Sequence, residues 1–476
     1  MKWSGRILAL MLMASTSLGC QASRQIRDRE YATLTQHVQQ ARIDTDETKA
    51  TPIPSPEFMG THSLEEYIQI ALGQNPRVQA VRKRMEALAH RVPVEASLQD
   101  PSLTVTVQPQ PVQTAAGQQD AILALSQRFP WFGKLAAKAG VAEAETNVAR
   151  AELAAIELET VAKVKKAYFE LFFVQKAIEV TEADQQLLLE IRTVADARYR
   201  SGSASQQDVL RANLEISDTE SQLIQLRQQL DSAQARLARH IHVAPNSELL
   251  ANETSPSVPT ILDLETLQRT AVSARPELHV MLAKLNSSRM AVELARLDYK
   301  PDVTLGMSWI DVSNSGVSPV ANGRDSVLLS AGINLPIYRK RLDSAVRSAE
   351  ASAVSAARNY DALRDETLEQ VTDLFAKVES QREMLELFEN DILPTARQTL
   401  AVSSQAYNVG EVDFLQLVDN WRQLFRYEIT NLRLQATLQQ TLAELEQTVG
   451  GLSVSEENVR PPATSKLLSD VSTRRE

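Results

Sequence analysis

The chain has 476 residues with 50 Lys and Arg against 60 Asp and Glu, and its net charge of −10 argues against nucleic acid as a partner. Glycine occurs at about half its usual frequency and aromatic residues make up 5%, which indicates long helices rather than compact α/β domains. The single cysteine, Cys20, excludes an internal disulfide and a cysteine-cluster metal site.

Residues 1–20 have the features of a secretory signal. Lys2 and Arg6 precede the apolar run ILALMLMA, which is too short to cross a bilayer as a mature helix, so we expect export. The run ends in SLGC, which resembles the bacterial lipobox, where cleavage before the cysteine leaves its sulfur to carry a lipid. Ser17 departs from that pattern, because a larger aliphatic residue is usual there. The alternative is that Cys20 is removed with an ordinary signal peptide.

Residues 21–62 are polar and fit a linker, and the first of two repeats is expected over residues 63–242. Within it, residues 103–107 read LTVTV, and this alternation of apolar and Thr side chains predicts a strand with two different faces. A partner strand near residues 122–127 alternates less regularly. No later run of 18 apolar residues exists, so any membrane crossing must use strands.

The longest predicted element follows Pro130. Residues 135–199 contain no proline and one glycine, so they predict one helix of about 65 residues, roughly 100 Å long. Gly202 then provides a turn suited to positive φ, and a return helix of about 35 residues follows. Ser205 and Asp208 have the spacing of a capping box at the start of this helix.

A Pro/Ser-rich segment, residues 243–262, joins this repeat to the second, expected over residues 263–451. In residues 303–309 and again in residues 326–340, apolar residues alternate with small or polar ones. Period two predicts strands whose faces differ in polarity. These two segments therefore form a second hairpin.

The long helix of the second repeat, residues 341–407, carries Pro394, which predicts a kink or break. The turn at Gly410 and a capping-box spacing at residues 413–416 repeat features of the first copy. After the second return helix, residues 452–476 are expected to form a flexible tail.

Prolines keep the two repeats in register. Pro76 and Pro276 are 200 residues apart, whereas Pro130 and Pro336 are 206 apart. Most of the difference falls inside the hairpins, where an exposed loop tolerates insertions. Four strands cannot close a membrane barrel, because the smallest barrels have about eight, so the chain is expected to oligomerise.

A lipobox-like start, followed by two copies of helix, strand hairpin, very long helix, Tyr-x-x-Gly turn and return helix, resembles the TolC family of bacterial outer-membrane efflux proteins. The resemblance covers about residues 60–450. It implies a mainly α fold with a small membrane β part, in which a homotrimer builds a twelve-stranded β-barrel on a twelve-helix periplasmic α-barrel. Such a protein lies in the outer membrane, extends into the periplasm, and passively conducts substrates.

The resemblance also implies partners and roles for residues. An inner-membrane pump, closest in look to the resistance-nodulation-division type, would hand over substrates through a periplasmic membrane-fusion adaptor. The adaptor would dock on the two helical tips, Arg200, Ser201, Gly202, Ser203, Asn408, Val409, Gly410 and Glu411. The pore gate would include Asp419 and Asp413, whereas Gln416 stands where members can carry an acid. The lipid-facing strand residues would be Val303, Leu305, Met307, Trp309, Val327, Leu329, Ala331, Ile333 and Leu335.

Simpler interpretations remain open. The tips could be plain helix turns, and Asp413 and Asp208 could only cap their helices. The chain has no HExxH, P-loop or nucleophile-elbow motif, and the close pair His240 and His242 fits a helix end better than a metal site, so we expect no enzyme and no cofactor. The rival functions are a periplasmic coiled-coil lipoprotein, acting as adaptor or scaffold, and an exported enzyme with a helical body.

Overall fold

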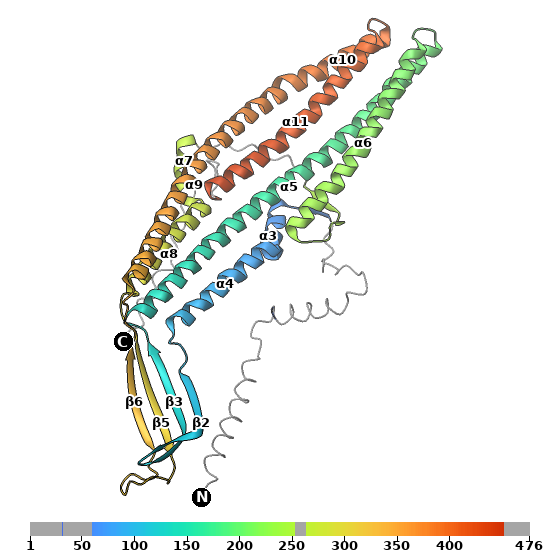
Figure 1. Ribbon diagram of the computed structural model, residues 1–476. Coiled ribbons are helices and arrows are strands. Elements are labelled where there is room, and N and C mark those ends of the chain that lie inside the picture. The colour runs from blue at the N-terminus through green and yellow to red at the C-terminus, as the bar shows by residue number, and fades with distance from the viewer. Residues whose placement is uncertain (1–30, 32–59, 253–262, 452–476) are drawn as a thin grey trace, which may run out of the picture. The chain divides into compact units, whose positions relative to one another are not determined.

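The computed structural model describes Tyr31, residues 60–252 and residues 263–451 (Figure 1). Cys20, the rest of the expected signal, the expected C-terminal tail and parts of both linkers lie outside the described residues. The first repeat comprises α3 (Leu64–Gln74), α4 (Pro76–Ala96), β2 (Ser102–Thr114), β3 (Gly117–Phe129), α5 (Lys134–Arg200) and α6 (Gln206–Ile241). The second comprises α7 (Leu264–Ala274), α8 (Pro276–Leu297), β5 (Val303–Val312), β6 (Ser326–Ile333), α9 (Arg339–Leu387), η2 (Phe388–Ile392), α10 (Leu393–Val409) and α11 (Phe414–Val449).

The predicted duplication and the predicted break are both confirmed. Helix α5 is a single helix of 67 residues. Its counterpart is interrupted by the π-helical turn η2, where the N–H of Leu393 bonds to the carbonyl of Phe388, five residues back. Pro394 follows immediately and has no N–H to donate, so the regular α-helical bond cannot form there. The π turn absorbs this missing bond without ending the helix.

The capping boxes predicted at residues 205–208 and 413–416 are wrong. The Ser205 hydroxyl accepts a hydrogen bond from the N–H of Gln207 at 3.1 Å, one residue earlier than a capping box requires. Asp413 occupies the N-cap position of α11, but its side chain makes no capping bond. Spacing alone identified the helix starts but not the bonds made there.

A small parallel sheet lies inside segments expected to be linkers. Strand β1 (Gly60–His62) pairs with β4 (Leu249–Ala251). The hydroxyl of Tyr67 donates to the carbonyl of Leu250 at 3.0 Å, and Tyr67 and Leu249 are fully buried. These residues pack in one core with the aromatic side chain of Tyr168 on α5. The start of the second linker is therefore part of the folded body.

The helices next to the larger sheet form a layer in the order α4, α5, α8, α9. Helix α6 packs along the other end of α5, and α11 packs against α5, α9 and α10 (Figure 1). Separate hydrophobic clusters hold these contacts, including one that joins α5, α6, α10 and α11 near the two turns. None of the helices in the described ranges is long and apolar enough to cross a membrane.

The two hairpins form one antiparallel sheet in the order β2-β3-β5-β6. Its register aligns the apolar residues of all four strands on one face. One row on that face is Leu103, Leu125, Met307 and Leu329, and the next is Val105, Leu123, Trp309 and Val327.

The opposite face carries small residues. A row of Ser102, Ser126, Gly306 and Ser330 crosses all four strands there. A Cβ atom at Gly306 would lie 2.5 Å from the Ser330 hydroxyl oxygen, so a larger residue there would require the Ser330 side chain to move. Leu328, Ile122 and Ile310 are apolar exceptions on this face. Strand β6 ends at Ile333, so Leu335, which was expected on this strand, lies beyond it.

Candidate functional site

The apolar face of the sheet is open. Leu305, Met307 and Trp309 of β5 are 49%, 49% and 36% exposed, although β5 is an interior strand with neighbours on both sides. The intervening Gly306 and Ser308 are only half-exposed. On β5 the apolar side is thus the more exposed one, the reverse of a strand whose apolar side packs on a core.

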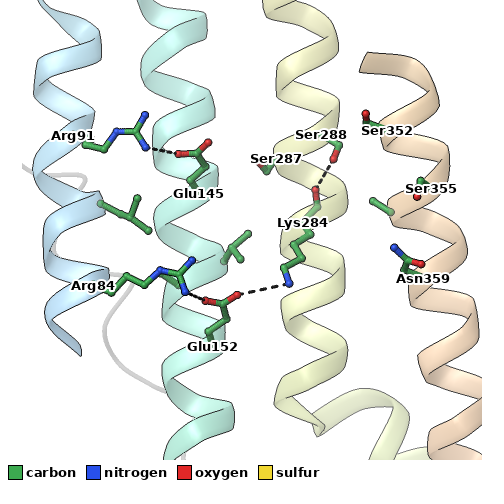
Figure 2. A pocket seen from close by; sticks show the side chains of 14 residues that line it. Arg84, Arg91, Glu145, Glu152, Lys284, Ser287, Ser288, Ser352, Ser355 and Asn359 are labelled. Atoms are coloured by element: carbon green, nitrogen blue, oxygen red, sulfur yellow. Dashed lines mark hydrogen bonds and ion pairs between the residues drawn. The ribbon is translucent and has the colours of Figure 1, made fainter. Parts of the chain in front are cut away.

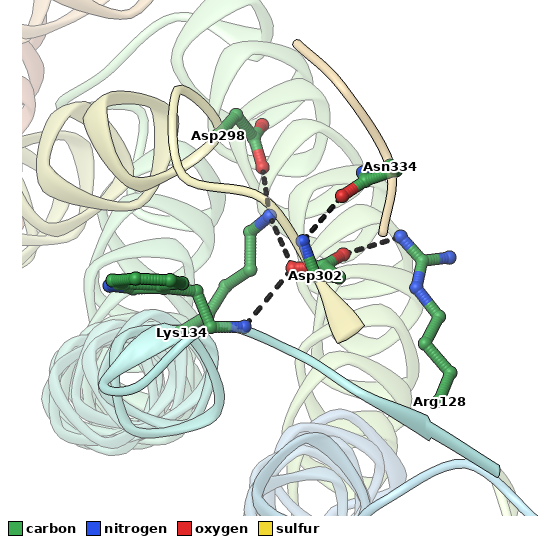
Figure 3. Close-up of polar contacts among 6 residues, drawn as sticks. Arg128, Lys134, Asp298, Asp302 and Asn334 are labelled. Carbon is green, nitrogen blue, oxygen red and sulfur yellow. Dashed lines mark hydrogen bonds and ion pairs between the residues drawn. The ribbon is translucent and has the colours of Figure 1, made fainter. Parts of the chain in front are cut away.

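A buried ion cluster joins the sheet to the helices (Figure 3). Asp302, which precedes β5, is 4% exposed and accepts hydrogen bonds from Arg128, from the Trp131 N–H at 3.1 Å and from the Lys134 ammonium at 3.2 Å. The Lys134 ammonium also pairs with Asp298 at 3.1 Å. One carboxylate therefore holds the end of β3, the start of α5 and the start of β5 together.

Hydrogen-bond donors compensate for the burial of the Asp302 carboxylate. Burial alone would raise the pKa of Asp302, but the hydrogen bonds from Arg128, Trp131 and Lys134 lower it below its usual range. The side-chain oxygen of Asn334 accepts a hydrogen bond from the backbone N–H of Asp302. Because Asn334 follows β6, this bond connects the last strand of the sheet to the cluster. Sequence reasoning missed these residues; their position beside Pro130, Pro301 and Pro336 was the available signal.

The eight predicted tip residues are exposed at two glycine turns. Gly202 and Gly410 have φ of 75° and 89°, as predicted. The turns themselves carry no hydrogen bond to each other among the described residues. Within the first tip, the Arg200 guanidinium pairs with Asp196 at 2.8 Å and the Ser201 hydroxyl donates to the Arg198 carbonyl at 2.9 Å.

Just inside the turns, residues that sequence reasoning missed connect the two repeats. The Arg198 guanidinium lies 4.5 Å from the ring centre of Tyr407, which is buried, and donates to the Ser203 carbonyl at 3.3 Å. The Tyr407 hydroxyl donates to Asp208 at 3.4 Å. Burial first, and then the Asp208 carboxylate, raise the pKa of Tyr407 to about 12. Asp208 thus faces the other repeat instead of capping its own helix.

The two predicted gate residues lie at the start of α11. Asp413 and Asp419 are both exposed. Arg422, one helical turn after Asp419, forms two hydrogen bonds with the buried carboxylate of Glu215 on α6, one of them 3.0 Å from Nε to Oε2. The structure therefore places a fixed cation beside the exposed carboxylate of Asp419.

The histidine pair lies at a helix end, as predicted. The carbonyl of His240 accepts from the Asn75 amide at 2.9 Å, and His242 ends α6 in the left-handed conformation. Within the described residues, no group of three or more His, Cys, Asp or Glu side chains could hold a metal ion.

Comparison with known proteins gives a consistent picture. A family model described as outer membrane efflux protein matches residues 67–241 and 267–451. The cobalt-zinc-cadmium resistance protein CzcC of Cupriavidus metallidurans is 22% identical over 415 residues, which cover 86% of this chain and 95% of that protein. The two matched ranges coincide with the two structural repeats.

Solved structures share the fold at low identity. The outer-membrane channel OprN superposes with a TM-score of 0.67 at 19% identity, covering 82% of this chain and 90% of that chain. CusC, whose structures concern transmembrane channel formation, gives a TM-score of 0.68 at 17% identity, covering 85% of this chain and 98% of that chain.

Proposed function

Because this chain belongs to the family of outer membrane efflux proteins, which are exit channels reaching from the outer membrane into the periplasm, we propose that three copies assemble into one duct. The observation that carries the proposal is the open sheet. Strands β2 and β6 have neighbours on one side only among the described residues, and the apolar face of the sheet is exposed. Unpaired strand edges are too costly in lipid, so β2 of one copy must pair with β6 of the next.

Closure of three four-stranded sheets gives a barrel of twelve strands. In it, the face carrying Leu305, Met307, Trp309, Val327 and Leu329 meets lipid, and the row of small residues faces water. The helices continue the wall as a periplasmic tube.

Assembly can be tested directly. Extracted from membranes in detergent, the protein should run as a heat-sensitive oligomer of three chains and conduct ions in planar bilayers. Recovery of a monomer that stays soluble without detergent would refute the proposal. The rival roles, a periplasmic scaffold and an exported enzyme, do not use an exposed apolar sheet.

The partners proposed for this duct are a periplasmic adaptor and an inner-membrane pump of the resistance-nodulation-division type. The adaptor docks on the tips, residues 200–203 and 408–411, where all side chains are exposed. Replacing each of these two segments with Gly-Ser-Gly-Ser should abolish export and adaptor co-purification while the trimer still forms. The same replacement at residues 317–320, in the loop between β5 and β6, is the control. Unchanged export in the tip variant would exclude this docking site.

The gate proposal concerns Asp419, with Asp413 nearer the turn. Three copies of an exposed carboxylate around a narrow axis favour cations over anions. Asp419→Asn should therefore lower the preference of the channel for K⁺ over Cl⁻, read from the reversal potential in a salt gradient. Asp231→Asn, which removes an exposed carboxylate in the middle of α6, is the matched control. An unaltered reversal potential would remove Asp419 from the gate.

The anchor proposal concerns Cys20, which lies outside the described residues. The sequence SLGC supports lipid attachment at its sulfur. Cys20→Ser should abolish incorporation of labelled palmitate, and equal labelling of both proteins would contradict the anchor.

A further inference from the structure

A cavity of about 620 Å³ opens on the layer of α4, α5, α8 and α9 (Figure 2). Side chains from all four helices line it, including the two outer ones, α4 and α9. Helix α5 contacts α4 and α8, and α8 contacts α9, so the helices stand in one row. A hollow that reaches from the first helix of a row to the last lies on the concave side of that row.

The charges on one side of the cavity are set by a heptad ladder. Three arginines of α4 are spaced seven residues apart, and so are the three glutamates of α5 that face them in the antiparallel direction. Such spacing keeps successive pairs on one edge of two packed helices. The pairs are Arg77–Glu159 at 3.1 Å, Arg84–Glu152 at 3.3 Å and Arg91–Glu145 at 3.1 Å.

Helix α8 contributes one more cation, Lys284, which has to share a carboxylate with an arginine of the ladder. The Lys284 ammonium lies 3.7 Å from Glu152, the same carboxylate that pairs with Arg84 (Figure 2). The cavity thus holds three cations, Arg84, Arg91 and Lys284, against two carboxylates. Arg91 also lies 3.9 Å from Glu95, outside the lining, so the excess of positive charge lies at Arg84 and Lys284, which share the single carboxylate of Glu152.

The cavity is also lined by polar side chains that can donate hydrogen bonds to a ligand. Ser287 on α8 and Ser355 and Asn359 on α9 line it. No hydrogen bond joins these three side chains to another group in the part of the chain that the structure describes. Lysine has three donor hydrogens and no acceptor, and Lys284 meets only one distant carboxylate oxygen. A ligand that fits such a site brings acceptor oxygens and negative charge.

We propose that this cavity binds oxyanion groups, the phosphate or carboxylate groups of solutes inside the duct. The inference rests on the proposed function, because only closure of three copies turns the concave faces toward a common interior. The assembly then carries a ring of three such sites. Because Lys284 and Arg84 are 46% and 65% exposed, binding is weak and salt-sensitive, which suits a duct that must release what it conducts.

Inorganic pyrophosphate is a suitable probe. Titrated at low salt against the full-length protein in detergent, it should show saturable broadening of its phosphorus NMR signal. Lys284→Gln combined with Arg84→Gln should raise the half-saturating concentration by about fivefold or more. Arg82→Gln is the matched control, because Arg82 lies on the same helix but pairs with Glu157 and does not line the cavity.

A second variant is expected to change the affinity for pyrophosphate in the opposite direction. Glu152→Gln frees both Arg84 and Lys284 from their shared carboxylate, so pyrophosphate should bind more tightly. A purely structural ion pair would not give this gain. Absence of saturable binding, or equal binding by wild type, Glu152→Gln and the double variant, would overturn the proposal. Channel formation in planar bilayers is measured separately, so failure of the duct and failure of the anion site are distinguishable.

Discussion

At the scale of single residues, the described core contains a carboxyl group that lacks compensation. Asp184 on α5 is 6% exposed, and its Oδ2 has no hydrogen-bond partner among the described residues. Burial raises the pKa of Asp184 to about 7, the nearby carboxylate of Glu428 on α11 adds to the rise, and the Trp421 N–H opposes it. Glu428 itself is paired with Arg397 at 2.9 Å. The contact between α5 and α11 is therefore sensitive to pH.

The sign of that dependence follows from the raised pKa. Between about pH 4 and pH 7, folded Asp184 keeps a proton that the unfolded chain has lost, so stability falls as pH rises through this range. Asp184→Asn should raise the apparent unfolding temperature at pH 8 and leave it nearly unchanged at pH 4. Glu190→Gln, an exposed position on the same helix, is the control. Equal pH dependence of wild type and Asp184→Asn would contradict this account.

The pair of Glu215 and Arg422 should behave differently from Asp184, because the buried carboxylate of Glu215 has the Arg422 guanidinium as a partner. Arg422→Ala leaves Glu215 buried without its partner, at a cost of about 3 kcal/mol, the low end for buried pairs because Arg422 is half-exposed. Glu215→Gln together with Arg422→Met should recover much of this loss. Chemical denaturation of the wild type and the two variants gives the comparison. A double variant as unstable as Arg422→Ala would show that the charge is not the cause.

At the scale of elements, long periodic segments were predictable and short ones were not. The continuity of α5 follows from a sequence without proline, and the break before α10 follows from Pro394. In contrast, β1 and β4 have three residues each, which is too few to show a period. Almost the whole first repeat also separates these two paired strands in the sequence. The same reason hid the cluster at Asp302, whose partner Lys134 is 168 residues away.

The π turn η2 depends on Pro394, and its removal is a test of that cause. Pro394→Ala restores a backbone N–H, so α9 and α10 should become one regular helix. Amide hydrogens of residues 389–395 should then exchange more slowly with solvent. Pro93→Ala, in α4, is a matched change at a proline without a π turn and should leave these amides unaffected. Unchanged exchange in Pro394→Ala would mean that tertiary packing, not the proline, imposes η2.

At the scale of the whole molecule, the four-stranded sheet has two edges and an apolar face without partners among the described residues. The helices bury apolar side chains against one another, because their hydrophobic clusters join neighbouring helices. The sheet leaves apolar side chains uncovered, since Leu329 on its edge strand is 83% exposed. Sequence alternation predicted the two faces, but only the register established that apolar residues of all four strands meet in the same rows. The open edges and exposed apolar face of the sheet are the features that support the proposed assembly of several copies in lipid.

Two adjacent leucines test which face meets lipid. Leu329 lies on the apolar face, and Leu328, its neighbour in β6, lies on the face of small residues. An arginine at a lipid-facing strand position costs about 2–4 kcal/mol near the bilayer centre, whereas a water-filled pore accommodates it. Leu329→Arg should therefore reduce the heat-sensitive trimer in the outer-membrane fraction, and Leu328→Arg should assemble at close to wild-type levels. Equal losses in the two variants, or a larger loss for Leu328→Arg, would reverse the assignment of the faces.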